Sequence, residues 1–124
     1  PMAQLYNLKA GVALDTDVVA AARPVVVASA NGAIAIAPST VVITKATAAN
    51  MTLGTPTTAQ NGTIIHIVAA TAAAHTVAAA TIGFNAGDAA KDTATFGGAI
   101  GDGLTVLAYG GEWLILSSTN ITLG

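Results

Sequence analysis

The chain has 124 residues and a mass of 12.0 kDa, which is enough for one compact core and too little for two. It contains no cysteine, which excludes disulfide frameworks, thiol nucleophiles, cysteine-based zinc sites and iron–sulfur ligation, and we expect synthesis in a reducing cytosol. The formal net charge is −2, and the four lysine and arginine residues are scattered along the chain. We therefore expect no nucleic-acid partner.

Charged side chains are unusually scarce in this sequence. They make up 8% of the residues, against about 25% in an ordinary soluble domain. Hydrophobic residues make up 53%, and most of these are Ala, Val and Ile. Because large exposed apolar patches mark interaction surfaces, we expect part of each subunit to be covered by copies of itself or by a larger assembly. A membrane partner is not expected, since the most apolar stretch, residues 18–37, is interrupted by Arg23-Pro24 and by Asn31-Gly32.

The first 22 residues are weakly patterned, and we expect an extended N-terminal arm over residues 1–22 and a β domain over residues 23–124. A helical spacing of apolar residues in the arm is interrupted by Gly11, and no good helix cap precedes it. The larger apolar side chains of the arm are Leu5, Tyr6, Leu8, Val12 and Leu14.

From Pro24 onward the pattern is that of short strands. Two β-rich runs, residues 24–30 and 33–37, flank Asn31-Gly32, a pair that favours a type I′ turn and predicts a hairpin. Residues 40–44 and 51–53 predict further short strands. Residues 62–68 alternate, with Ile65 and Ile67 on one face of a strand that we expect to be covered on both faces. The Ala-rich residues 69–80 lack large apolar side chains for a packed helix, and we predict strand or coil there.

The C-terminal part contains the clearest motif of the chain. After a short strand over 93–96 and a glycine-rich loop over 97–103, two β-rich runs, residues 104–109 and 112–116, are joined by Gly110-Gly111, which predicts a two-residue hairpin. Residues 119–123 predict a last strand. Many short strands separated by turns are typical of an all-β fold, and we expect a small antiparallel sandwich or barrel-like domain.

The residues that can carry chemistry do not combine into a catalytic or metal site. Asp15 and Asp17 have a spacing that can hold a divalent cation, but no further carboxylate follows them. Asp88, Asp92 and Asp102 lie in glycine-rich loops, where we expect them to cap turns. The two histidines, His66 and His75, lack a third ligand for zinc, and we expect His66 to be buried, neutral and hydrogen-bonded. We therefore expect no enzyme activity and no cofactor.

Trp113 is the one tryptophan, and two roles are open for it. It can be a core or interface anchor, which we favour, or a platform for stacking a sugar. The strand pattern leads us to expect an oligomer interface formed by six residues: Ile65, His66, Ile67, Phe96, Trp113 and Ile115.

Residues 40–124 resemble a known protein family. The segments that carry the resemblance are AHTV at 74–77, GF at 83–84, DTATFGG at 92–98, GDGL at 101–104, AYGGEW at 108–113 and TNITL at 119–123. They are similar to small phage and prophage virion proteins described as head decoration, cement or head-fibre proteins. The resemblance implies a structural protein that acts as a homotrimer at three-fold positions between major capsid protein subunits, on the exterior of the virion, after synthesis in the bacterial cytoplasm.

In this interpretation the arm residues Leu5, Tyr6, Leu8, Val12 and Leu14, together with one face of the β domain, bind the capsid. The alternative is a trimeric virion adhesin or fibre knob, in which Trp113, Tyr109 and the loop over 97–103 bind a host-surface glycan.

Overall fold

The computed structural model describes residues 23–124, which form a domain built almost entirely from β-strands. The predicted arm, with its proposed capsid-binding residues and the Asp15–Asp17 pair, lies outside the described residues. Within the described range, the only helical elements are two single 3₁₀ turns, η1 (Thr58–Gln60) and η2 (Ala89–Lys91). The prediction of an all-β fold is confirmed.

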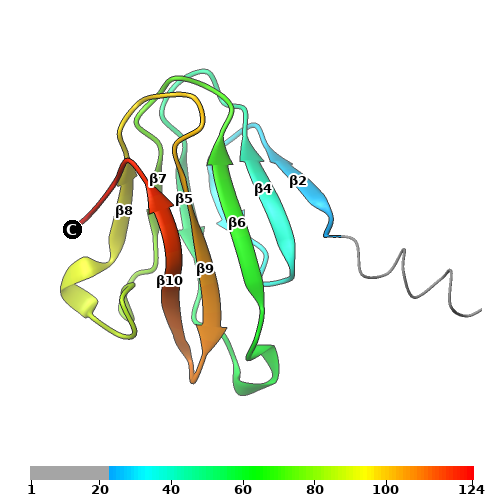
Figure 1. Cartoon of the computed structure of the whole chain (residues 1–124), viewed down its shortest axis with the longest axis vertical. Coiled ribbons are helices and arrows are strands. Elements are labelled where there is room, and N and C mark those ends of the chain that lie inside the picture. Colours follow the sequence, from blue (N-terminus) through cyan, green and yellow to red (C-terminus); the bar gives the residue numbers. More distant parts are fainter. Residues whose placement is uncertain (1–22) are drawn as a thin grey trace, which may run out of the picture.

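Ten strands form two five-stranded sheets that face each other (Figure 1). The sheet nearer the viewer, here called the front sheet, has the order β10-β9-β6-β4-β2, and the back sheet has the order β11-β8-β7-β5-β3. The front strands are β2 (Val25–Ala28), β4 (Ser39–Ile43), β6 (Ile64–Ala69), β9 (Gly103–Tyr109) and β10 (Glu112–Thr119). The back strands are β3 (Gly32–Ile34), β5 (Asn50–Leu53), β7 (Thr76–Ala78), β8 (Thr93–Phe96) and β11 (Ile121–Leu123).

Strands β2 to β7 form three successive coils. Each coil contributes one strand to the front sheet and one strand to the back sheet. β2 and β3 form the first coil, β4 and β5 the second, and β6 and β7 the third. Strands of successive coils pair in parallel, β2 with β4 and β4 with β6 in front, and β3 with β5 and β5 with β7 behind. The prediction of an antiparallel domain is therefore wrong for this half, because each parallel crossover passes through the opposite sheet rather than through a helix.

The predicted hairpin at Asn31-Gly32 is wrong for the same reason. β2 and β3, on either side of this pair, belong to different sheets and do not pair with each other. The Oδ1 atom of Asn31 accepts a hydrogen bond from the backbone N–H of Asn50 at 3.0 Å, which ties this corner to the next coil. Gly32 does not adopt the positive φ that a type I′ turn requires.

The four C-terminal strands form only antiparallel pairs. β8 pairs with β7, β9 with β6, β10 with β9, and β11 with β8. The predicted hairpin is confirmed, since Tyr109 pairs with Glu112 across Gly110 and Gly111, which both have positive φ, 63° and 77°. The predicted strand over residues 119–123 is also present, as the end of β10 and β11.

The core fills the space between the two sheets. Alternate residues of each strand point inward, so that β4, β6, β7 and β8 each show a strict alternation of buried and half-buried positions. The largest fully buried side chains come from both sheets and their connections: Trp113, Phe84, Phe96, Ile43, Leu53, Ile65, Ile67, His75, Val77 and Val106.

Candidate interaction surface

Four of the six residues predicted to form an oligomer interface lie inside the core of the single chain. Ile65, Ile67, Phe96 and Trp113 are all at most 1% exposed. Their assignment to an interface is corrected, because side chains that fill the space between the sheets present no surface to a neighbouring copy. Alternation along residues 62–68 correctly separated the two faces of the strand, but it did not show which face points inward.

Trp113 is an anchor of the core. Its indole ring is 0% exposed, and its Nε1–H group donates a hydrogen bond of 2.9 Å to the carbonyl oxygen of Gly54 in the loop after β5. The bond satisfies the one polar group of the buried ring. A fully buried indole cannot stack against a sugar, so the glycan platform proposed for Trp113 is ruled out.

His66 and Ile115 are the two predicted interface residues that keep some exposure. His66 lies on the outer side of β6, half-buried, and its Nδ1 atom is 2.8 Å from the Oγ1 atom of Thr105 on β9. Within the described residues only the neighbouring side chains of its own sheet cover His66, so its predicted burial against a neighbouring subunit stays a prediction. Ile115 is half-buried and packs against the core.

The outer face of the front sheet is formed by rows of side chains that the strand register aligns. One row contains Val27, Val42 and Val68, and a second contains Ile64, Leu107 and Leu114. Between them runs a row that contains no Asp, Glu, Lys or Arg: Val25, Thr40, His66 and Thr105. We call these ten residues the outer front face.

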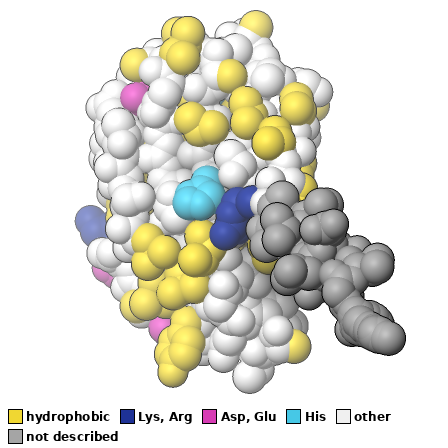
Figure 2. Space-filling model, turned by 45° about the vertical axis from the view of Figure 1, so that its right-hand side comes forward, with side chains coloured by type: hydrophobic (Ala, Val, Ile, Leu, Met, Phe, Trp, Pro, Cys, Tyr) yellow, Lys and Arg dark blue, Asp and Glu magenta, His cyan; other side chains and the backbone are white. Residues whose placement is uncertain are grey.

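The outer front face is open to solvent and apolar. Val25 and Val27 are 66% and 62% exposed, and the other eight residues are half-buried. Figure 2 shows yellow side chains on both sides of one histidine, which is His66 because His75 is buried. An antiparallel or mixed sheet with one solvated face normally carries polar residues there, so this face has the composition of a covered surface.

Charge is almost absent from the strands. Among the strands of residues 23–124, Glu112 at the start of β10 is the only residue with an ionised side chain. Arg23 lies at the border of the outer front face, where its guanidinium donates a hydrogen bond to the backbone carbonyl of Ile64. A partner that covers this face therefore meets one cation, Arg23, at its border and no pattern of opposite charges to complement.

The outer face of the back sheet differs in composition. Its register aligns Asn50, Thr76, Thr95 and Thr122 in one row and Thr52, Ala78 and Thr93 in another. These side chains are short and mostly hydroxylated, and Thr52 and Thr122 are exposed. Threonine combines high β propensity with a group that water can solvate. The two faces of the domain thus differ: the back face suits solvent, and the front face suits an apolar partner.

The second histidine, His75, is a structural residue of the core. Its Nδ1 atom accepts a hydrogen bond from the backbone N–H of Ala49 at 2.9 Å, and its Nε2 atom is 2.9 Å from the hydroxyl of Thr71. Because that hydroxyl donates its hydrogen to the carbonyl oxygen of Lys45, Nε2–H must be the donor to Thr71, and the imidazole is neutral. The ring also packs edge-on against Phe96, with ring centroids 5.9 Å apart. Neither ring nitrogen is left for a metal.

Two of the three loop aspartates, Asp88 and Asp102, cap turns as predicted, whereas Asp92 accepts a hydrogen bond from the hydroxyl of Thr93 at 3.1 Å. Asp88 accepts from the backbone N–H of Ala90, two residues on. The Oδ2 atom of Asp102 accepts from the backbone N–H of Ala99 at 2.9 Å and from the side-chain amide of Asn120 at 3.1 Å. Within residues 23–124, no three His, Asp or Glu side chains lie close enough together to hold a metal ion.

No protein-family model and no curated protein matches the sequence. Among the described residues, no helix has the length and apolar character needed to cross a membrane.

Proposed function

We propose that this chain is a structural virion protein, a head decoration or cement protein that binds as a homotrimer to the outside of a phage capsid and stabilises it. The observation that carries the proposal is the outer front face, a mostly apolar surface whose ten residues include no Asp, Glu, Lys or Arg and that no other part of residues 23–124 covers. The resemblance of residues 40–124 to decoration and head-fibre proteins supplies the biological setting.

The outer front face supports association of identical copies. Each half-exposed Val, Ile or Leu that a neighbouring copy covers contributes about 1 kcal/mol, since full burial of such a side chain is worth about 1.5 to 3 kcal/mol. His66 and Thr105 are already hydrogen-bonded to each other within the sheet, which lowers the cost of burying these two side chains. A closed cyclic trimer covers this face in every subunit and leaves the threonine-rich back face in solvent.

A trimer is suited to clamping a capsid shell. Three identical weak contacts that engage together give avidity without a large footprint for each copy. A protein that binds only assembled capsomers stabilises the shell by mass action. In the proposal, the arm residues Leu5, Tyr6, Leu8, Val12 and Leu14 contact the major capsid protein.

The oligomeric state tests the role of the outer front face. We expect light scattering to give a native mass that is a multiple of the chain mass, three for a trimer. Val42→Asp and Val68→Asp place a carboxylate on neighbouring positions of this face, because Val42 pairs with Val68, and each variant should reduce the native mass to that of one chain. Thr52→Asp adds the same charge on the back face and should leave the native mass unchanged.

Binding to expanded empty heads tests the virion role. The wild-type protein should sediment with heads, and heads carrying it should withstand higher temperature than bare heads. A wild-type chain that remains a folded monomer at high concentration and that does not bind heads would contradict the proposal.

A further inference from the structure

Successive coils are tied together at one end of the sandwich by side chains that accept backbone N–H groups. Asn31, in the corner between β2 and β3, accepts from the N–H of Asn50 through Oδ1 at 3.0 Å. His75, just before β7, accepts from the N–H of Ala49 through Nδ1 at 2.9 Å. Two adjacent residues of the second coil therefore bind the coil on either side, Asn50 the first coil and Ala49 the third.

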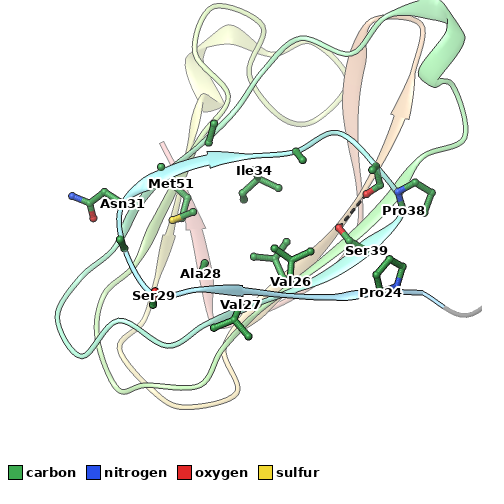
Figure 3. A pocket seen from close by; sticks show the side chains of 16 residues that line it. Pro24, Val26, Val27, Ala28, Ser29, Asn31, Ile34, Pro38, Ser39 and Met51 are labelled. Atoms are coloured by element: carbon green, nitrogen blue, oxygen red, sulfur yellow. Dashed lines mark hydrogen bonds between the residues drawn. The ribbon is translucent and has the colours of Figure 1, made fainter.

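The tie to the first coil contains no group that titrates near neutral pH. Figure 3 shows Asn31 at one corner of this coil, at the opposite end from Pro24 and Pro38. The interior of the coil is an open cavity of about 390 Å³, and no ionisable side chain lines it. Residues 24–38 contain no Asp, Glu, His, Lys or Arg. A change of pH therefore leaves the charge of the first coil unchanged.

The tie to the third coil passes through an imidazole ring whose two nitrogens are both in use. His75 is 0% exposed, and its Nε2–H group donates to the hydroxyl of Thr71 at 2.9 Å. That hydroxyl donates in turn to the carbonyl oxygen of Lys45 at 2.6 Å. The corner over residues 44–49 is thus held to the corner over residues 70–75 at two points, Ala49 and Lys45. Both bonds require the neutral ring with its hydrogen on Nε2.

A second proton on this ring is incompatible with the tie. It has to enter at Nδ1, where it faces the N–H of Ala49, so that two donors oppose each other across a distance that suits a donor and an acceptor. One of the two groups must turn away. Ala49 is 0% exposed, so its N–H then lacks an acceptor, and a cation is left in the core. The protonated ring is satisfied only when this end of the sandwich opens to water.

The charged groups of the surrounding loops do not supply a partner for a protonated His75. The corner over residues 44–49 carries Lys45, a cation, whose ammonium donates to the hydroxyl of Thr47 and to the carbonyl oxygen of Ala48. The loop after β8 carries Asp102, whose Oδ2 atom is engaged by the loop itself and by Asn120. Strand β8 contributes Phe96, which packs edge-on against the ring. Within residues 23–124, no carboxylate is hydrogen-bonded to His75.

We propose that His75 is an acid-sensitive clamp: the neutral ring holds the 44–49 corner against the 70–75 corner, and uptake of a proton breaks this tie and destabilises the sandwich. A histidine in an unfolded chain takes up its proton near pH 6.5. Below that pH the unfolded chain binds one proton more than the clamped domain, so the contribution of the clamp is complete above this pH and is lost as the pH falls. The ratio of folded to unfolded protein should decrease up to about tenfold for each further pH unit.

The clamp does not depend on the virion function, because all of its groups belong to one chain. It concerns the end of the sandwich at which β2, β4 and β6 finish, whereas association is proposed for the outer front face. A protein that is a monomer, or that does not bind heads, can therefore still have the clamp.

Urea denaturation at about pH 7 and about pH 5.5 tests the proposal, since carboxylates ordinarily titrate below this range. The folding equilibrium constant of the full wild-type chain, followed by Trp113 fluorescence, should fall about tenfold between the two values. His75→Asn keeps an acceptor for the N–H of Ala49 but does not titrate, and its stability should be the same at both. His66→Asn removes the other histidine and should keep the wild-type dependence. The same fall in His75→Asn, or none in the wild type, would overturn the proposal.

Nitrogen NMR of the wild-type protein provides a measurement that needs no variant to fold. Between about pH 7 and about pH 5.5, the ring of His66 on the outer side of β6 should gain its second proton. His75 should keep the signals of the neutral ring with its hydrogen on Nε2 for as long as the domain is folded. A folded domain in which the ring of His75 carries two protons at the lower pH contradicts the clamp.

Discussion

Replacing His75 by leucine tests the hydrogen-bond network at the centre of the core. The substitution keeps an apolar side chain of similar size but removes the acceptor of the Ala49 N–H group, and Ala49 is itself fully buried. A buried donor without a partner costs about 1 to 3 kcal/mol. The edge-on contact with Phe96 adds about 0.5 to 1.5 kcal/mol. We therefore expect His75→Leu to lower the free energy of unfolding by about 2 to 4 kcal/mol.

Urea denaturation followed by Trp113 fluorescence measures this loss, because the single tryptophan is buried and reports on the core. With a slope of about 1 to 2 kcal/mol per molar urea, the midpoint should fall by about 2 M. His66→Leu is the matched control: it removes one hydrogen bond on the outer side of the sheet and should cost less than about 1 kcal/mol. All variants are compared at one protein concentration, since association adds to apparent stability. Equal losses in the two variants would refute the structural role of His75.

Three further predictions follow from particular contacts. Gly103→Ala should destabilise the domain by about 1 to 3 kcal/mol, because the added methyl group runs into the backbone of Ile67 and Val68, whereas Gly32→Ala meets open space and should change unfolding in urea by less than about 0.5 kcal/mol. Asp102→Ala should cost about 1 to 3 kcal/mol in the same assay, since the Ala99 N–H group and the Asn120 amide lose their acceptor, and a neutral result would contradict this. Association through an uncharged face should persist at high salt and strengthen in sulfate, so a native mass that falls as salt rises would point to charged contacts instead.

Local patterns predicted the strands well and their pairing only in part. The Gly110-Gly111 hairpin could be predicted because both of its strands lie next to the turn, and its geometry depends on two adjacent residues with positive φ. The Asn31-Gly32 pair carries a similar turn preference, yet the runs around it enter different sheets. The partners of β2 and β3 lie in the next coil, and no short-range signal marks a contact at that distance.

The sequence predicted that an interaction surface exists, but it did not predict which residues form that surface. The scarcity of charge and the wealth of Val, Ile and Ala were visible in the composition and indicated a covered surface somewhere on the molecule. Hydrophobicity alone then led to Ile65, Ile67, Phe96 and Trp113, which are core residues. The outer front face consists of their less conspicuous neighbours, such as Val42, Val68 and Leu107.

The sequence by itself determined that the described domain is all-β, where most of its strands lie and that Asp88 and Asp102 cap turns, because each of these properties depends on neighbouring residues. Only the tertiary structure decided which side of each strand is interior, since a period of two identifies the two faces of a strand and leaves their direction open. The parallel winding between the two sheets, the apolar face that it exposes and the open first coil depend on residues that are brought together from distant parts of the chain.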